Sequence, residues 1–313
     1  MRILLWHVHG TWTTAFVQGG HDYLIPALPG RPPDGRGRPS RPGTFDWPPN
    51  AIEVTPGQLG AADIDVAVAQ RPDDLELIAR WTGRRPGLDL PVVYVEHNAP
   101  QGPVANMRHP AADRPGLVMV HVTHFNRLFW DCGRTPVKVI EHGVPDPGYR
   151  YTGELEAAAV VVNEPLRRGR VTGTDLLAEF RRWFGVNVFG MGSEPVGGVD
   201  LPHKRLLDEL PRHRLYLHPV RWTSLGLSLI EAMHLGMPVV GLATTEAPEA
   251  VPRAAGRLST DVGTLVLACR ELLADPALAR RTGLQAREHA LARYGLDRFL
   301  GDWNRLLAEV TSR

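Results

Sequence analysis

The residues best suited to chemistry lie in one stretch of the second half, Leu215–Glu249, which reads LYLHPVRWTSLGLSLIEAMHLGMPVVGLATTEAPEA. An apolar strand ends at His218-Pro219, a short loop follows, and we expect a helix to begin near Ser224 with Gly226 in its first turn. A helix N-terminus presents unpaired amide groups and a partial positive charge, which favour a phosphate. The pattern therefore predicts an anion site where this helix begins.

Side chains around this helix start add hydroxyl groups and one acid. Gly226 would let a pyrophosphate approach the backbone, and the hydroxyls of Ser224 and Ser228 can donate to it. Glu231 lies four residues after Leu227, one helical turn along on the same face. From there its carboxylate can accept hydrogen bonds from two vicinal hydroxyls, as acidic residues do with ribose in dinucleotide-binding folds. An exposed glutamate on an ordinary amphipathic helix is the alternative interpretation.

Three arginines follow the first predicted strand of the same half. After Ala158–Val162 the chain reads NEPLRRGR, which contains Arg167, Arg168 and Arg170. A guanidinium group can bind phosphate through two N–H groups at once and keeps its charge. These arginines are therefore candidates for binding a phosphate group, and a solvated basic loop is the alternative. The spacing leaves open which of the three would bind.

The elements that must position these groups alternate along nearly the whole chain. Short apolar runs followed by helical patterns are typical of βαβ units and a parallel sheet. The first half predicts strands at Ile3–Val8, Ile64–Ala69, Val92–Val95, Leu117–Val122 and Val137–Ile140, an uncertain strand at Tyr23–Ala27, and helices at Asp73–Trp81 and Phe125–Cys132. The second half predicts strands at Ala158–Val162, Val186–Phe189, Leu215–Leu217 and Pro238–Gly241, and helices at Thr174–Phe184, His203–Leu210, Leu225–Leu235, Val262–Leu273, Ala277–Ala292 and Leu296–Val310.

The length of 313 residues suggests two domains. The strand–helix pattern restarts after the Pro- and Gly-rich stretch Val144–Gly153, which we interpret as a linker. We expect an N-terminal Rossmann-like domain at 1–147, a second domain with the predicted anion site at 148–295, and a C-terminal helix at 296–313 that can cross back to the first domain. The predicted fold class is α/β, with two doubly wound domains facing a cleft and a ligand at the carboxyl ends of the strands.

Composition narrows the class of protein. The formal net charge is +1, and the basic residues are 33 arginines and two lysines. The arginines are scattered and balanced by acids, which argues against nucleic acid as a partner and is typical of a GC-rich, actinobacterial-like genome. No apolar run approaches the ~18 residues of a membrane span, and the N-terminus lacks a signal-peptide pattern, so a soluble, cytoplasmic protein is expected. Cys132 and Cys269 each lie in a predicted helix, where buried reduced thiols are expected.

An excess of Pro and Gly is concentrated in Pro29–Asn50, where seven Pro and four Gly fall among 22 residues. Pro lacks an amide donor and Gly costs backbone entropy, so no regular helix or central strand is expected there. Long structureless loops within a domain are usually functional or disordered. We expect a mobile functional loop here, and an inert excursion is the alternative.

The block Leu215–Gly241 resembles the donor-site signature of the retaining family-4 glycosyltransferases of GT-B fold, the group 1 glycosyltransferases. LYLHPVRW, SLGLSLIEAM and LGMPVVG match this signature in order and spacing. That family has two glutamates eight positions apart. Glu231 falls on the second, which grips the nucleotide ribose. Thr223 falls on the first, which contacts the donor sugar, so this chain keeps a hydroxyl there without the anion.

The resemblance implies further donor contacts. The backbone at Leu225 and Leu227 would join Ser224, Gly226 and Ser228 at the phosphates. Glu249 would take the acidic position of the following loop, where Thr244-Thr245 replaces the family's usual glycine pair. The family's diphosphate-binding Arg and Lys would correspond to residues in the NEPLRRGR segment: Arg167 and Arg170 as catalytic groups, with Arg168 beside them as a donor-binding group.

The resemblance is weaker in the first half. His97, after the strand Val92–Val95, matches a histidine that the family places beside the donor sugar, where it can donate a hydrogen bond or remove the acceptor proton. A structural loop histidine is the alternative. Gly19 and Gly20 would be the glycine pair of the family's first loop. Gly143 is kept in the turn that closes the domain. The expected acceptor-binding residues are His9, Trp12, Phe45 and Trp47.

The function implied by the resemblance is transfer of a sugar, with retention and without a metal, from a UDP- or GDP-sugar to a carbohydrate or glycoconjugate acceptor. No cofactor is implied, and peripheral membrane association stays open. A degenerate relative that binds without transfer is the main alternative, followed by an epimerase or phosphorylase of the same architecture. Two possible metal-ligand pairs, Asp63/Asp65 and His7/His9, lack convincing partners, so no metal site is expected.

Overall fold

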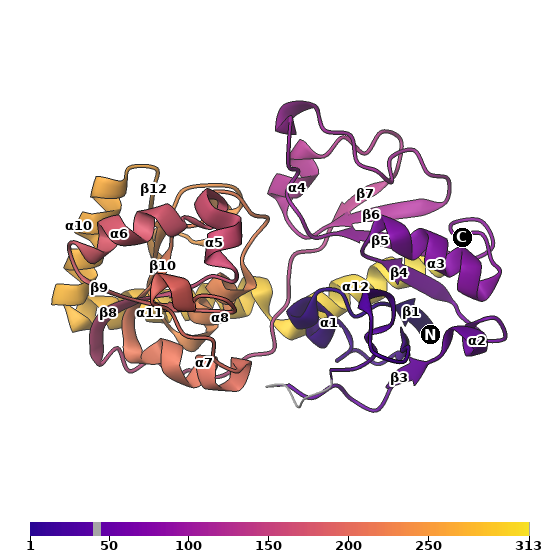
Figure 1. Ribbon diagram of the computed structural model, residues 1–313, viewed down its shortest axis with the longest axis horizontal. Helices are drawn as coiled ribbons and strands as arrows, with labels where there is room; N and C mark the ends of the chain where they lie inside the picture. Colours follow the sequence, from indigo (N-terminus) through magenta and orange to yellow (C-terminus); the bar gives the residue numbers. More distant parts are fainter. Residues whose placement is uncertain (40–44, 313) are drawn as a thin grey trace. The chain divides into compact units, whose positions relative to one another are not determined.

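The computed structural model describes residues 1–39 and 45–312 and divides the chain into two compact units (Figure 1). Unit 1 comprises Met1–Gly143 and Leu296–Arg313, and unit 2 comprises Val144–Gly295. Part of the Pro29–Asn50 loop, residues 40–44, lies outside the described residues. The change of unit falls at 143/144, and the last helix is part of unit 1.

Unit 1 is built on a seven-stranded sheet in the order β3-β2-β1-β4-β5-β6-β7. Every neighbouring pair is parallel. The strands are β1 (Arg2–Leu5), β2 (Asp22–Pro26), β3 (Ala51–Val54), β4 (Val66–Ala69), β5 (Val92–Glu96), β6 (Leu117–His121) and β7 (Val137–Val139). The helices are α1 (Gly10–Phe16), α2 (Pro56–Leu59), α3 (Pro72–Thr82), α4 (His124–Phe129) and α12 (Leu296–Thr311), with the 3-10 turns η1 (Pro33–Gly35) and η2 (Val104–Asn106).

Successive side chains along these strands point to opposite faces of the sheet, so they pack into two separate cores, one on each face. Val93 and Val95 of β5 belong to the core that contains α1 and α12. Val92 and Tyr94 of the same strand belong to the core that contains α3. Because both faces are covered, the strands read as continuous apolar runs in the sequence, and this is why they could be predicted.

The last helix, α12, belongs to the core of unit 1 although 152 residues of unit 2 precede it in the chain. Phe299 and Trp303 are buried and pack edge-on against Trp12 of α1. In Figure 1 α12, in yellow, runs beside the strands of unit 1. Gly143 lies under this helix, because a Cβ there would come within 2.2 Å of the Phe299 Cβ. A glycine at 143 therefore allows the segment after β7 to approach α12 closely.

Unit 2 contains a five-stranded parallel sheet in the order β12-β11-β10-β8-β9. Its strands are β8 (Leu155–Val161), β9 (Gly185–Phe189), β10 (His213–His218), β11 (Val239–Leu242) and β12 (Gly256–Ser259). Its helices are α5 (Pro165–Arg168), α6 (Leu177–Arg181), α7 (His203–Glu209), α8 (Leu227–Leu235), α9 (Ala247–Ala250), α10 (Val262–Ala274) and α11 (Pro276–Tyr294), with 3-10 turns η3 (Gly169–Thr172), η4 (Thr174–Leu176), η5 (Glu194–Val196) and η6 (Leu210–Arg212).

Local signals fix the ends of the longer helices in unit 2. Asp261 caps α10 by accepting from the amides of Gly263 and Thr264. Gly236 ends α8 in the left-handed conformation, with φ of +89°. The predicted α/β class with two parallel sheets is confirmed.

Three local predictions need correction. α4 ends at Phe129, so Cys132 lies in the loop after it and not in a helix, although it is buried and free as expected. The expected helix Thr174–Phe184 is split between the 3-10 turn η4 and the short α6, because Gly173 in the left-handed conformation starts a tight turn. Helix α8 begins at Leu227 with Gly226 as N-cap, so Ser224 precedes it.

Candidate donor site and its partners

Three loops follow the carboxyl ends of β8, β10 and β11 in unit 2, and their contacts hold them together. Arg221, after β10, donates its backbone N–H to the carbonyl oxygen of Val171 at 2.9 Å. Thr244, after β11, donates its hydroxyl to the carbonyl oxygen of Val220 at 2.8 Å. Gly173 has φ of +74° and passes so close to Pro219 that a Cβ would meet its carbonyl oxygen at 1.9 Å. The loop after β10 is therefore fixed from both sides.

The first of these loops contains the three candidate arginines, and the structure separates them by their partners. Arg167 pairs with Glu164, and Arg170 pairs with Asp175 at 3.0 Å, and both guanidinium groups are mostly exposed. Arg168 is half-buried, and within the described residues its guanidinium group has no hydrogen-bond or ion-pair partner. Burial, together with the charge of Arg167, lowers the pKa of Arg168. Of the three arginines, Arg168 is thus the one whose guanidinium group is available to bind a ligand anion.

The start of α8 is an open helix terminus next to a buried imidazole. The first backbone hydrogen bond of α8 runs from Leu229 N–H to Gly226 O at 3.0 Å. The backbone N–H groups that precede Leu229 at a helix start have no intrahelical partners. The ring of His218 lies against Gly226, whose Cβ would come within 3.3 Å of His218 Cε1. Burial lowers the pKa of His218 to about 4, so the ring is neutral at pH 7. A side chain at 226 would crowd this imidazole and the helix start.

Glu231 is buried in α8 and forms one side-chain contact across to α7. The Glu231 Oε1 accepts from His203 Nε2 at 2.9 Å, and the carboxylate side chain is only 6% exposed. The alternative interpretation, an exposed glutamate on an ordinary amphipathic helix, therefore does not apply to Glu231. On the same helix, Ser228 Oγ lies 3.0 Å from the hydroxyl of Tyr216, a fully buried residue of β10.

The remaining donor-side candidates lie around these groups. Thr223 and Leu225 are in the loop before α8; Thr223 is half-buried, whereas Ser224 and Leu225 are buried. Glu249 is exposed on α9. Three residues earlier Glu246 is buried, 3.7 Å from Arg293 Nη2. The acid of this loop that is enclosed by the protein is thus Glu246, which the sequence did not single out.

In unit 1 three histidines gather at the carboxyl ends of β1, β5 and β7. The rings of His9 and His97 are 4.0 Å apart, and those of His97 and His142 are 6.4 Å apart. Burial lowers the pKa of His97 well below its usual value, and the charges of His9 and His142 add to this effect. Trp12 packs edge-on against His97. His97 is thus a neutral imidazole at pH 7, suited to hydrogen bonding.

A second polar group supports the turn that carries His97. The preceding residue, Glu96, accepts from Asn98 N–H at 2.6 Å and contacts His109 Nε2 at 2.9 Å. His109 Nδ1 accepts from the Ala111 amide at 3.0 Å, which places the ring proton on Nε2, facing Glu96. No sequence pattern pointed to this network, because its members are separated in the chain.

The other candidates of unit 1 lie in different surroundings. Trp12 is 1% exposed and Trp47 is 6% exposed, and Trp47 donates its ring N–H to Thr14. Phe45 is half-buried. Gly19 and Gly20 follow α1 and precede β2, so they are at the amino-end edge of the sheet, whereas His9 and His97 follow strand carboxyl ends. The structure therefore does not bring the glycine pair together with the histidines.

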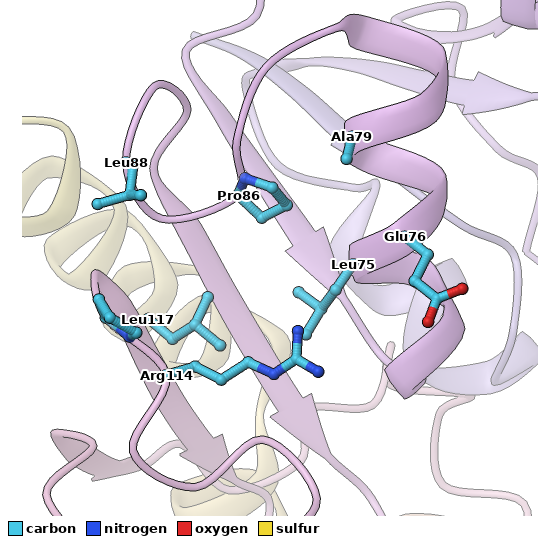
Figure 2. Close-up of a pocket in the computed structure, with 8 residues that line it drawn as sticks. Leu75, Glu76, Ala79, Pro86, Leu88, Arg114 and Leu117 are labelled. Atoms are coloured by element: carbon cyan, nitrogen blue, oxygen red, sulfur yellow. The ribbon is translucent and has the colours of Figure 1, made fainter.

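A cavity of about 440 Å³ opens elsewhere on unit 1, between α3 and the segments that precede β5 and β6 (Figure 2). Leu117, the first residue of β6, forms part of its lining with Leu75 of α3, and Arg114 reaches across it. The connection from β5 to β6 contains the 3-10 turn η2 and no α-helix, which leaves this groove beside α3. It shares no lining residue with the groups described above.

Among the described residues, no group of three or more His, Cys, Asp or Glu could hold a metal ion. None of the helices found in residues 1–39 and 45–312 has the length and hydropathy that a bilayer crossing requires.

One segment of unit 2 matches a known family model. Residues 181–275 match the family model described as "Glycosyl transferases group 1", a segment that contains His203, α8 and Glu231. The two-sheet architecture is the GT-B fold of glycosyltransferases, and this segment matches a glycosyltransferase family model. No curated protein matches the sequence.

Solved structures of similar fold span the whole chain. Sucrose-phosphate synthase from Thermosynechococcus elongatus is 15% identical, with a TM-score of 0.70 over 100% of this chain and 99% of that one. Anabaena HepE, solved in complex with UDP-glucose, is 16% identical, with a TM-score of 0.70 over 99% and 100%. A glycosyltransferase from Rickettsia africae is 14% identical, with a TM-score of 0.67 over 99% and 98%. At these identities the similarity establishes the fold.

Proposed function

We propose that this protein transfers a sugar from a nucleoside-diphosphate sugar to a carbohydrate or glycoconjugate acceptor, with retention of configuration and without a metal. The observation that carries the proposal is the enclosed carboxylate of Glu231, held on one oxygen by His203 and placed one turn from the open start of α8. This arrangement is suited to a ribose and a diphosphate that belong to one molecule. UDP and UDP-glucose bound to HepE support the choice of donor class.

The diphosphate is assigned to the start of α8 and to Arg168. As the bond between the anomeric carbon and the diphosphate oxygen breaks, negative charge develops on the leaving phosphate. Fixed donors aimed at that charge stabilise the transition state by about 3–4 kcal/mol each in comparable oxyanion sites. The amides of Leu227 and Ser228 and the half-buried guanidinium group of Arg168 are such donors. Arg167 and Arg170 already have acidic partners, Glu164 and Asp175.

The transfer step we propose is attack from the leaving-group side. The acceptor hydroxyl oxygen forms the new bond to the anomeric carbon while the bond to the diphosphate oxygen breaks, and the hydroxyl proton moves to that leaving oxygen. No enzyme nucleophile is required. We assign His97, whose imidazole burial keeps neutral at pH 7, as a hydrogen-bond donor to a sugar hydroxyl.

The test is nucleotide release from UDP- and GDP-sugars, measured with and without acceptor extracts, for the wild type and Glu231→Ala. We expect release that depends on the donor, and donor affinity lower by roughly 10–100-fold in Glu231→Ala, since hydrogen bonds to a charged group contribute about 1.5–3 kcal/mol. Glu271→Ala, an exposed acid on α10, is the matched control and should bind as the wild type does. Unchanged affinity in Glu231→Ala would refute the ribose role.

A second candidate function is binding of a nucleotide sugar without transfer. Thr223 favours it, because this position lacks the carboxylate that the resembled family uses at the donor sugar. Tight binding of a nucleotide sugar, with neither release nor transfer under any of the conditions above, would establish this function instead.

A further inference from the structure

His203 and Glu231 form a contact between two helices that are separated in the chain. His203 is the first residue of α7, and Glu231 lies in the middle of α8. The ring Nε2 is 2.9 Å from Glu231 Oε1, and the two side chains are 36% and 6% exposed. The contact therefore lies at the edge of the buried region, and the imidazole is more exposed than the carboxylate.

The carboxylate needs this partner for a physical reason. A buried charge is costly unless it is paired or hydrogen-bonded. Among the described residues, His203 is the one side chain that bonds to Glu231, and it takes one of the two carboxylate oxygens. Burial alone would lower the pKa of His203, but the hydrogen bond and the charge of Glu231 outweigh burial and raise it. The carboxylate of Glu231 thus favours the protonated, positively charged form of the His203 imidazole.

The neighbouring polar groups do not take over this role. Tyr216 on β10 directs its hydroxyl to Ser228, and burial raises its pKa, so it stays neutral. His234, one turn further along α8, donates through Nδ1 to the carbonyl oxygen of Ile230 at 2.9 Å. Burial lowers the pKa of His234 as well.

We infer that His203 is the positioning residue for Glu231: its ring N–H fixes Oε1 and so leaves Oε2 for the vicinal hydroxyls of a nucleotide ribose. His203 acts through the acid and not on the substrate. The inference rests on the proposed function, because it specifies how the ribose contact is oriented. A carboxylate without this anchor can rotate about its side-chain bonds, and the ribose contact then has to restrict that rotation.

The experiment measures the affinity for UDP and 2′-deoxy-UDP, and for GDP and 2′-deoxy-GDP, in the wild type and in His203→Ala, His203→Gln and Glu231→Ala. Lys204→Ala, an exposed neighbour on the same turn, is the matched control. In the wild type we expect the ribonucleotide to bind roughly 10-fold more tightly than its 2′-deoxy form, the effect of about one hydrogen bond to a charged group. This ratio should fall toward one in Glu231→Ala and in His203→Ala, while the 2′-deoxy form, which keeps only the 3′-hydroxyl, loses less affinity than the ribonucleotide.

His203→Gln supplies an amide N–H in place of the ring N–H and should restore most of the ratio, which a general loss of structure would not do. If His203→Ala does not fold, His203→Leu, which keeps the volume without a donor, takes its place. A ratio that is lost in Glu231→Ala but fully kept in His203→Ala overturns this inference and leaves the proposed function standing. A wild type that binds neither UDP nor GDP overturns the proposed function and the inference together.

Discussion

Asp175 accepts hydrogen bonds from Arg221 on both carboxylate oxygens, one of them at 2.9 Å, and thereby joins the loop after β8 to the loop after β10. The same carboxylate also accepts from Arg170 at 3.0 Å, and Arg221 reaches back to the Arg170 carbonyl oxygen at 3.0 Å. One acid therefore aligns the segment that carries the candidate phosphate-binding arginines with the segment that leads into α8.

Removal of this acid should weaken donor binding more than it weakens the fold. In Asp175→Ala both arginines lose their anchor, and we expect donor affinity to fall by roughly 10-fold, the effect of about one charge-assisted hydrogen bond. The free energy of unfolding should change by no more than about 1 kcal/mol, because the ion pairs are substantially exposed. Calorimetric titration with UDP or GDP and thermal unfolding check the two quantities. Asp208→Ala, which breaks the exposed pair with Arg150, is the control, and equal donor affinity in the two variants would contradict the alignment role.

Substitution of Arg168 should weaken donor binding more than substitution of Arg167. Arg168→Ala removes the guanidinium group that has no protein partner in the described structure, so we expect donor affinity to drop by roughly 10–100-fold. Arg167→Ala removes a guanidinium group already paired with the exposed Glu164 and should change it by less than about threefold. Nucleoside diphosphate and the matching nucleoside, titrated in parallel, separate the phosphate contribution. A larger loss in Arg167→Ala than in Arg168→Ala would reverse the assignment.

The hydroxyl of Thr223 can be tested without a change in volume. If it contacts the donor sugar, Thr223→Val should lower transfer by roughly 5–10-fold, which corresponds to about 1 kcal/mol for one neutral hydrogen bond. Thr223→Ser keeps the hydroxyl and should retain most of the activity. The affinity for free nucleotide should be the same in both variants, since the nucleotide lacks the sugar. Similar rates for the two substitutions would show that the hydroxyl takes no part.

The sequence predicted the strands of both sheets better than their helices, and the reason lies in burial. A strand such as Val92–Glu96, covered on both faces, is a continuous apolar run that can be recognised locally. Helix α1 was missed because Gly10–Phe16 contains a glycine and four β-branched or aromatic residues in its first five positions, and its burial against α12 outweighs weak propensity. The edge strands β3 and β12 were also missed.

The candidate site likewise contains residues that a local pattern reveals and residues that it does not. Glu231 and the start of α8 could be predicted because they lie within one continuous segment whose spacing shows their common face. His203 and Asp175 could not, because their partners are 28 and 46 residues away and only the tertiary fold brings them together. Trp12 follows a predicted strand and Trp47 lies in the Pro- and Gly-rich loop Pro29–Asn50, but residue type and position do not reveal that both rings are buried.

Acid should destabilise the protein through its buried neutral histidines. Burial lowers the pKa of His121 and of His142 to about 3 and that of His218 to about 4. In the unfolded chain each titrates near 6.5. Below that value the unfolded state binds more protons, so stability is lost as the pH falls, at up to about 1.4 kcal/mol per pH unit for each such group. Denaturant unfolding between pH 7 and pH 5 checks this. His218→Asn should reduce the slope, and an unchanged slope in that variant would contradict the low pKa.

The His203–Glu231 pair should respond to pH with the opposite sign. Because Glu231 raises the pKa of His203 in the folded state, the stabilisation from this pair is fully present below the unfolded value near 6.5 and is lost as the pH rises through the raised pKa. His203→Gln cannot titrate, so the difference in unfolding free energy between wild type and variant should be largest near pH 6 and shrink toward pH 9. Denaturant unfolding of both proteins across this range measures the difference. A difference that stays constant with pH would mean that the ring is not charged by its partner, and that the contact is an ordinary neutral hydrogen bond.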